Sequence, residues 1–178
     1  APEDPLPETT DTKRMAMAID VAASVRTATA PNPWVGAVLV SADGRLHVGA
    51  TEPPGGRHAE IVALDAARTH GGGDAARDAV LYVTLEPCAH TGRTGPCADA
   101  LIEAGVRRVV VAIADPDPLV AGAGMARLRD AGVAVELGCL AEEVDEQLTP
   151  YLHHRRTGRP WVVLKLASTL DGRTAAAD

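Results

Sequence analysis

Aromatic residues are nearly absent from this sequence. Its 178 residues include two Trp, two Tyr and no Phe, so a hydrophobic core must be built from aliphatic side chains. The three cysteines are an odd number, unlike the even disulfide framework of a small secreted fold. No apolar stretch approaches the ~20 residues that span a bilayer, and the acidic, Pro-rich start is unlike a signal peptide. We therefore expect a cytoplasmic protein with reduced thiols.

Positive charge is also scarce. The 17 Lys and Arg residues are outnumbered by 24 Asp and Glu residues, which gives a formal net charge of −7. A nucleic-acid groove usually needs a cationic face, so we expect no nucleic-acid partner, and we expect no membrane partner either. With 46% apolar residues, the chain can bury a core, and its length suits one ordinary domain.

Helices and strands are expected to alternate along most of the chain. Residues 1–12 have almost nothing to bury and are expected to be a disordered lead-in. After them, apolar spacing, Gly and Pro positions predict helices at residues 13–25, 58–69, 97–104, 124–131 and 142–148, and strands at residues 34–40, 46–48, 80–85, 106–113, 133–137 and 160–166. This order predicts an α/β fold with a parallel-biased sheet covered by helices on both faces.

Three short segments contain the residues that are suited to metal chemistry. They are His58-Ala59-Glu60, Pro87-Cys88 and Pro96-Cys97, and each lies where a loop or strand end meets a predicted helix start. Two thiolates and one imidazole suit Zn²⁺, and three protein ligands leave a fourth position for water. Glu60 follows His58 by two residues, which places a carboxylate near the metal without making it a ligand.

Each segment alone also has a plainer interpretation. His-Ala-Glu can simply begin a helix, and the two cysteines can be buried thiols that pack like small apolar residues. Taken together, the segments match the zinc deaminase signature, in which H-x-E precedes a later Pro-Cys and a second Cys. The match is loose, because eight residues separate Cys88 from Cys97 where the signature has two.

The segment around the cysteines resembles a known family. Residues 83–97 read VTLEPCAHTGRTGPC and resemble the deaminase half of the bifunctional riboflavin-biosynthesis deaminase/reductases. The resemblance covers residues 13–178 and includes Pro31-Asn32-Pro33, Val35-Gly36, His58-Ala59-Glu60, Asp115-Pro116 and the segments at residues 100–106, 120–124, 158–160 and 164–175. It implies the cytidine-deaminase-like fold, a three-layer αβα sandwich around a central mixed sheet of about five strands.

The resemblance also implies a reaction. The family deaminates 2,5-diamino-6-ribosylamino-4(3H)-pyrimidinone 5′-phosphate to 5-amino-6-ribosylamino-2,4(1H,3H)-pyrimidinedione 5′-phosphate, with zinc as cofactor and loss of ammonia. In this sequence His58, Cys88 and Cys97 match the zinc ligands, and Glu60 matches the proton shuttle. The implied partner is therefore a small phosphorylated amino-pyrimidine.

Four further residues are candidate substrate contacts. Asn32 matches a pyrimidine-contacting Asn, although an Asn between two prolines also simply forms turns. Arg93 matches a basic position that faces the phosphate, with a solvated loop charge as the alternative. His90 lies in the same loop and either contacts substrate or braces the loop. Thr51 stands where the family often has His, and Asp117 departs from the Asn of Asp-Pro-Asn-Pro by adding a negative charge.

The resemblance divides the chain into segments. Residues 13–150 match the deaminase domain, and residues 151–178 match a linker, basic at residues 155–158, and the first strand of a missing or truncated reductase domain. Ala167 matches a position that borders the NADPH site of that domain. Only thirteen residues follow Lys165, so NADPH is implied only if a full reductase domain is present, and no reductase activity is expected of this chain.

Two other functions fit parts of the pattern. One is a deaminase of another amino-pyrimidine or nucleobase, which the long Cys88–Cys97 spacing disfavours. The other is a non-catalytic zinc-binding module, which Glu60 disfavours because a structural site needs no extra carboxylate. Free sheet edges and the strand expected at residues 160–166 also suggest a possible homo-oligomer.

Overall fold

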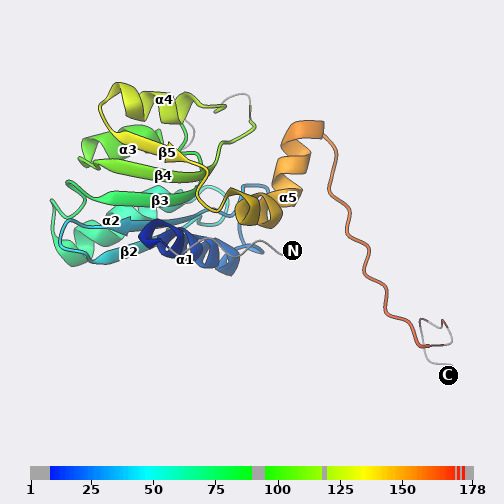
Figure 1. The fold of residues 1–178 in the computed structure, drawn as a ribbon. Coiled ribbons are helices and arrows are strands. Elements are labelled where there is room, and N and C mark those ends of the chain that lie inside the picture. The colour runs from blue at the N-terminus through cyan, green and yellow to red at the C-terminus, as the bar shows by residue number, and fades with distance from the viewer. Residues whose placement is uncertain (1–8, 90–94, 118–119, 171, 173, 175–178) are drawn as a thin grey trace, which may run out of the picture.

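The computed structural model describes residues 9–89, 95–117, 120–170, 172 and 174. Its strands form one five-stranded sheet in the order β2-β1-β3-β4-β5 (Figure 1). The strands are β1 (Gly36–Val40), β2 (Leu46–Ala50), β3 (Val80–Leu85), β4 (Arg108–Ile113) and β5 (Ala134–Leu137). β1 is antiparallel to both β2 and β3, whereas the pairs β3–β4 and β4–β5 are parallel. The expected mixed sheet of about five strands is confirmed.

Helices cover both faces of this sheet. α1 (Thr10–Ser24) and α5 (Ala141–Thr157) lie on one face, where Gln147 Nε2 donates to the Ile19 carbonyl at 2.9 Å. α2 (Ala59–Gly71) and α3 (Cys97–Glu103) lie on the other face, and α4 (Ala123–Asp130) packs beside α3 (Figure 1). The three-layer αβα sandwich is thus confirmed. No helix among the described residues has the length and apolarity to cross a membrane.

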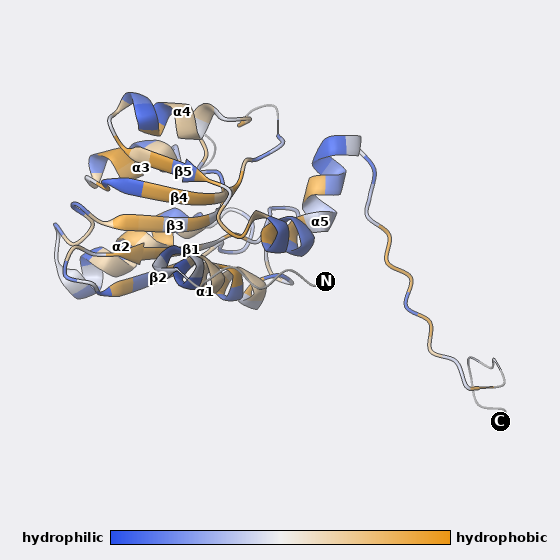
Figure 2. Ribbon diagram, in the orientation of Figure 1, coloured by the Kyte–Doolittle hydropathy of each residue, from blue (hydrophilic) through white to orange (hydrophobic). Residues whose placement is uncertain are grey.

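The core is aliphatic, as the scarcity of aromatic residues requires. Every residue of β3 is buried, and β3 is the central strand of the sheet. The largest fully buried side chains are those of Met15, Leu39, Leu64, Leu81, Leu101, Leu128, Leu148 and Leu152. Figure 2 shows the apolar residues concentrated in the strands and on the helix faces that meet them. Burial of every residue is typical of a strand that is covered on both faces.

A glycine allows α2 to lie unusually close to the sheet. A Cβ atom on Gly49 of β2 would collide with the carbonyl oxygen of Ala59, the first residue of α2. Any larger residue at this position would push the start of α2 away from β2. The glycine therefore fixes the position of the helix start that carries His58 and Glu60.

Two expected boundaries are wrong. α1 begins at Thr10, inside the expected lead-in of residues 1–12, because the Thr9 side chain accepts a hydrogen bond from the Thr12 N–H and caps the helix; residues 1–8 lie outside the described part. α5 was expected to end near residue 148 but continues to Thr157, so residues 151–157 are helical instead of a linker. Its buried residues Val144, Leu148 and Leu152 keep a spacing of four across Pro150.

The strand expected at residues 160–166 is not formed. Residues 160–169 have no regular secondary structure, and the side chains of residues 162–164 are 77–80% exposed. The segment extends away from the sheet (Figure 1). A strand needs a neighbour for its backbone hydrogen bonds, and no neighbouring strand lies beside this segment among the described residues.

Candidate metal centre and pocket

His58, Cys88 and Cys97 come together from three different elements. His58 lies immediately before α2, Cys88 follows β3 by three residues, and Cys97 is the first residue of α3. Their potential ligand atoms all lie within 4.8 Å of one another. Among the described residues, no other group of three or more His, Cys, Asp or Glu side chains is arranged so that it could hold a metal ion. The structure therefore brings together all three residues that the sequence suggested as zinc ligands.

The distances in this cluster fit a zinc ion. The Sγ atoms of Cys97 and Cys88 lie 3.3 and 3.7 Å from His58 Nδ1. Zinc bonds of about 2.3 Å to sulfur and 2.0 Å to nitrogen in a tetrahedron place the ligand atoms about 3.5 Å apart. Both cysteines are buried, and one imidazole with two thiolates is a donor set that selects zinc.

The two thiols do not ionise independently. The pKa of Cys88 is lowered, to about 4, because Cys97 and His58 donate hydrogen bonds to its sulfur, and the Cys97 N–H also lies 3.4 Å from this sulfur. The pKa of Cys97 is raised, because its thiol donates a hydrogen bond to the Cys88 sulfur and is itself buried. The pair therefore holds one proton firmly, and binding of a divalent cation to both sulfurs would release it.

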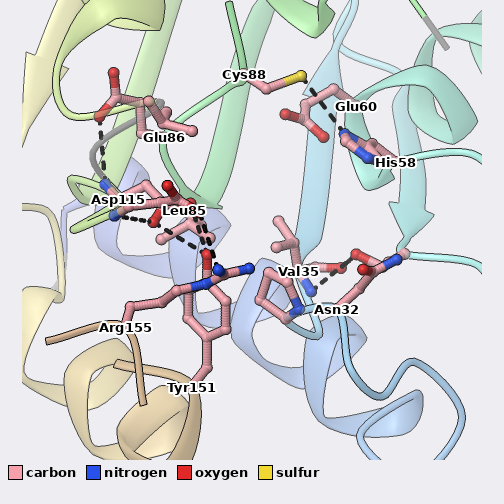
Figure 3. Close-up of a pocket in the computed structure, with 14 residues that line it drawn as sticks. Asn32, Val35, His58, Glu60, Leu85, Glu86, Cys88, Asp115, Tyr151 and Arg155 are labelled. Atoms are coloured by element: carbon pink, nitrogen blue, oxygen red, sulfur yellow. Dashed lines mark hydrogen bonds and ion pairs between the residues drawn. The ribbon is translucent and has the colours of Figure 1, made fainter. Parts of the chain in front are cut away.

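Glu60 lies beside the cluster without belonging to it. It sits in the first turn of α2, and its side chain is only 4% exposed. Burial raises its pKa to about 7, against the opposing charge of His58. Figure 3 shows its carboxylate between Cys88 and His58, at one end of a pocket. A carboxyl group whose pKa lies near neutral pH can both accept and donate a proton, which is the property of a general acid–base.

The pocket extends from this cluster toward α5. It is lined by Asn32, Pro33, Val35, Thr51, His58, Glu60, Leu85, Glu86, Cys88, Asp115, Asp117, Val120, Tyr151 and Arg155. Of the expected substrate contacts, Asn32 and Thr51 are therefore at the pocket, whereas His90 and Arg93 lie outside the described residues. Ala167 is in the exposed segment after α5 and does not line the pocket.

Asn32 and Thr51 lie on the side of the pocket where the chain enters β1 and leaves β2. The Thr51 hydroxyl accepts a hydrogen bond from the Val35 N–H at 3.0 Å and is 5% exposed as a residue. Its hydroxyl thus fixes the backbone that enters β1. The Asn32 backbone is held by Thr29 through two hydrogen bonds, and Figure 3 shows Asn32 on the same side as Val35.

Glu86 organises the opposite wall, a role that the sequence did not suggest. Its buried carboxylate accepts the backbone N–H groups of Asp115, Gly122, Gly124 and Met125 at 3.0–3.3 Å. Four N–H donors neutralise much of a buried negative charge. Glu86 therefore ties the chain between β4 and α4 to the strand end that carries Cys88.

A glycine at the start of α4 makes this arrangement possible. A Cβ atom on Gly124 would collide with the carbonyl oxygen of Pro87, the residue before Cys88. Gly124 thus lets α4 begin directly against the Cys88 segment. The signal in the sequence was the glycine itself, but nothing near it in the sequence indicates what it contacts.

Tyr151 and Arg155 are the other pocket residues that sequence reasoning missed. The Tyr151 hydroxyl donates to both carboxylate oxygens of Asp115, at 3.1 and 3.0 Å. Arg155 Nη1 lies 3.2 Å from Asp117 Oδ2. Both residues belong to the part of α5 that was expected to be a linker. Because the helix was expected to end near residue 148, these two residues were not predicted to line the pocket.

Comparison with known proteins agrees with this geometry. A family model described as the cytidine and deoxycytidylate deaminase zinc-binding region matches residues 8–113, more than half of the chain. All four residues of the metal cluster and its neighbouring carboxylate, His58, Glu60, Cys88 and Cys97, lie within the matched region.

Longer riboflavin-biosynthesis proteins are similar to more than nine-tenths of the chain. The riboflavin biosynthesis protein RibD of Mycobacterium tuberculosis is 49% identical over 166 residues, which are 92% of this chain and 47% of the relative. The solved RibD of Acinetobacter baumannii has a TM-score of 0.84 at 47% identity, over 94% of this chain and 46% of that one.

A third relative has both of its activities in its name. The Thermotoga maritima diaminohydroxyphosphoribosylaminopyrimidine deaminase/5-amino-6-(5-phosphoribosylamino)uracil reductase has a TM-score of 0.83 at 40% identity, over 93% of this chain and 46% of that one. The chain thus spans about half the length of these relatives.

Proposed function

Because the chain belongs to the zinc-binding cytidine and deoxycytidylate deaminase family, we propose that it deaminates 2,5-diamino-6-ribosylamino-4(3H)-pyrimidinone 5′-phosphate. The products are 5-amino-6-ribosylamino-2,4(1H,3H)-pyrimidinedione 5′-phosphate and ammonia. The observation that carries this proposal is the His58, Cys88 and Cys97 cluster with buried Glu60 beside it, at the end of a pocket. The name of the Thermotoga maritima relative supports this choice of substrate.

We assign the zinc ligands to His58, Cys88 and Cys97. Their ligand atoms converge within 4.8 Å, and two buried thiols with an imidazole are a donor set that suits zinc. When bound, zinc supplies a Lewis acid that lowers the pKa of water from 15.7 to about 7. With three protein ligands, a bound zinc ion would keep a position for water, as catalytic zinc sites do.

Glu60 is the proton carrier in this proposal. It takes a proton from the attacking water and gives it to the ring nitrogen next to the amine-bearing carbon. It then takes the remaining proton of the hydroxyl group that has been added to that carbon and gives it to the leaving amine, so that the carbonyl forms as the C–N bond breaks. Water and the amine substrate thus give the carbonyl product and ammonia, with every proton accounted for. Its place in the first turn of α2, with its carboxylate beside Cys88 and His58, suits this role.

The other substrate contacts are assigned to the pocket residues that lie before β1 and after β2. Asn32 binds the pyrimidine, and Thr51 closes the pocket beside it while its hydroxyl holds the Val35 backbone. Arg93 remains a prediction for a contact with the phosphate, and His90 remains a prediction for a contact with substrate or for a brace of its own loop. We assign only the deaminase reaction to these residues, and Ala167 would border NADPH only together with a full reductase domain.

An assay of ammonia release tests the substrate. Zinc-loaded protein is given the diaminopyrimidine phosphate, deoxycytidine monophosphate or guanine at equal concentrations, with Glu60→Gln as the inactive control. We expect the diaminopyrimidine phosphate to react at least ~10²-fold faster than the others, because a site built around one set of polar groups rejects analogues that leave those groups unpaired. Equal or faster release from either of the other two would assign this chain to another deaminase.

A further inference from the structure

Arg155 projects from α5 to the end of the pocket that lies opposite the metal cluster. Its guanidinium carbon lies 5.3 Å from the centre of the Tyr151 ring, and its Nη1 is 3.2 Å from Asp117 Oδ2. Figure 3 shows Arg155 and Tyr151 across the pocket from Cys88, Glu60 and His58. A ligand with its reacting group at the metal would therefore extend toward Arg155.

The residues around Arg155 hold it in place. Tyr151 donates its hydroxyl to both oxygens of Asp115, and Asp115 is itself bonded through its N–H to the buried carboxylate of Glu86. The ring of Tyr151 is therefore a fixed surface, and a guanidinium group stacks well on an aromatic face. Arg155 is presented to the pocket by a rigid support rather than by a free surface side chain.

The charges in the pocket make Arg155 distinctive. Among the described residues that line the pocket, it is the one Lys or Arg, whereas Glu60, Glu86, Asp115 and Asp117 are acidic. A cation at this end lowers the electrostatic cost of bringing an anionic group beside Asp115 and Asp117, because like charges repel strongly at low dielectric. The side chain of Arg155 is 40% exposed and that of Asp117 is 16% exposed, so the pair lies at the boundary between pocket and solvent.

We propose that Arg155 binds the anionic end of the substrate, and that Asp117 is the internal anion that occupies Arg155 until substrate arrives. This inference rests on the proposed function, because the phosphate of the diaminopyrimidine substrate is the anion concerned. A guanidinium group has five N–H donors in a planar fork that matches phosphate oxygens in pairs. Binding therefore exchanges one oxygen anion for another at Arg155 while its stacking on Tyr151 is kept.

This arrangement gives Asp117 a defined part in specificity. The carboxylate competes with the phosphate for the same guanidinium, and it also repels the phosphate directly. A neutral residue of the same size at this position would remove both effects. Asp117→Asn should therefore strengthen phosphate binding, whereas removal of Arg155 should weaken it.

The test compares the phosphorylated substrate with its dephosphorylated form. We expect Arg155→Ala to lower the preference for the phosphorylated form, measured as the ratio of the two kcat/KM values, by roughly 10- to 150-fold. Arg155→Lys keeps the charge but not the fork, and should give an intermediate ratio. Asp117→Asn should raise the ratio.

Arg156→Ala is the matched control. Arg156 is the next residue of the same helix, but its Nη2 pairs with Asp145 at 3.0 Å and it does not line the pocket. This variant should leave the ratio unchanged. An equal loss for both substrate forms in Arg155→Ala would mean that Arg155 only supports α5, and it would overturn the inference, as would an Asp117→Asn ratio that falls.

A binding measurement separates this inference from the proposed function. In an NMR titration of the full chain with ribose 5-phosphate, Arg155→Ala should weaken binding and Arg156→Ala should not. If Arg155→Ala binds ribose 5-phosphate as tightly as the unmodified protein does, the role of Arg155 is contradicted even if the diaminopyrimidine phosphate is deaminated. An Arg155-dependent titration with no deamination of that substrate would instead contradict the proposed substrate and keep the anion site.

Discussion

The pocket has a metal end, made of His58, Glu60, Cys88 and Cys97, and an arginine end, made of Asp115, Asp117, Tyr151 and Arg155. At the metal end His58, Glu60 and Cys97 lie at helix starts, and Cys88 lies just after β3. At the arginine end Tyr151 meets Asp115 across 36 positions of sequence. Folding joins distant residues at both ends, since His58 and Cys97 are 39 positions apart. The metal end differs because it carries the short His-Ala-Glu and Pro-Cys motifs, whereas the arginine end depends on the packing of α5.

The two ends also differ in burial and chemistry. The described cysteines of the metal end and Glu60 are at most 8% exposed, which suits groups whose pKa values must be shifted for reaction. Arg155 remains partly exposed and keeps its charge in any environment. The comparison suggests that the metal end determines whether the reaction occurs and the arginine end determines which substrate is used. Changes at each end should therefore alter different quantities.

The largest effect is expected from loss of a zinc ligand. Cys88→Ala removes one of three protein ligands, so zinc should be lost and deaminase activity should fall by at least ~10³-fold. Elemental analysis should find about one zinc per chain in the unmodified protein. Cys139→Ala is the control, because this thiol lies outside the cluster and its removal should keep the zinc. Full activity in the metal-free variant would contradict the assigned ligands.

Glu60→Gln should separate proton transfer from metal binding. The amide fills the same space but cannot carry the proton, so kcat should fall by at least ~10²-fold while zinc stays bound. Zinc content and kcat are measured on the same sample, with the exposed Glu142→Gln as control. If the variant instead loses zinc and its activity is proportional to the zinc that remains, the role assigned to Glu60 is wrong.

The sequence predicted the metal end better than the arginine end. His58, Cys88 and Cys97 were recognised because their residue types are rare and each stands beside a predicted helix start. Arg155 was missed because the basic, polar residues 155–158 suggested a linker, whereas the helix continues to Thr157 with Leu148 and Leu152 buried. Arginine is common on surfaces, so only its position in the folded molecule distinguishes it.

The same difference applies to the fold. Alternating apolar runs and glycine-containing turns were sufficient to predict the strands of the sheet and the helix order. The strand expected at residues 160–166 had the right composition, but composition does not supply the neighbouring strand on which pairing depends. The contacts of Gly49 and Gly124 were likewise beyond reach, because each is made with a residue distant in sequence or on another element.

A smaller effect is expected when the support of the arginine end is weakened. Tyr151→Phe removes the hydroxyl that bonds Asp115 but keeps the ring under Arg155. KM for the phosphorylated substrate should rise by up to ~10-fold with little change in kcat, because one hydrogen bond to a charged group is lost. Tyr82→Phe is the matched control, since its hydroxyl donates to Asp11 at 2.6 Å and neither residue lines the pocket.

Both variants should lose comparable folding stability, on the order of 1–3 kcal/mol in urea unfolding. Only Tyr151→Phe should change KM. If the two variants raise KM equally, the effect reflects general destabilisation, and the arginine end has no separate part in substrate binding.

The smallest effect is expected in the segment beyond α5. Val163 is 77% exposed and lies in a stretch without regular secondary structure, so Val163→Ser should change the free energy of unfolding by no more than ~0.5 kcal/mol. Leu148→Ala, at a fully buried position of α5, should cost ~2–5 kcal/mol by the same urea measurement. A cost above ~1 kcal/mol for Val163→Ser would mean that the segment packs on the sheet or on a partner in solution. In that case its apolar residues contribute to stability, and the boundary of the deaminase domain lies beyond α5.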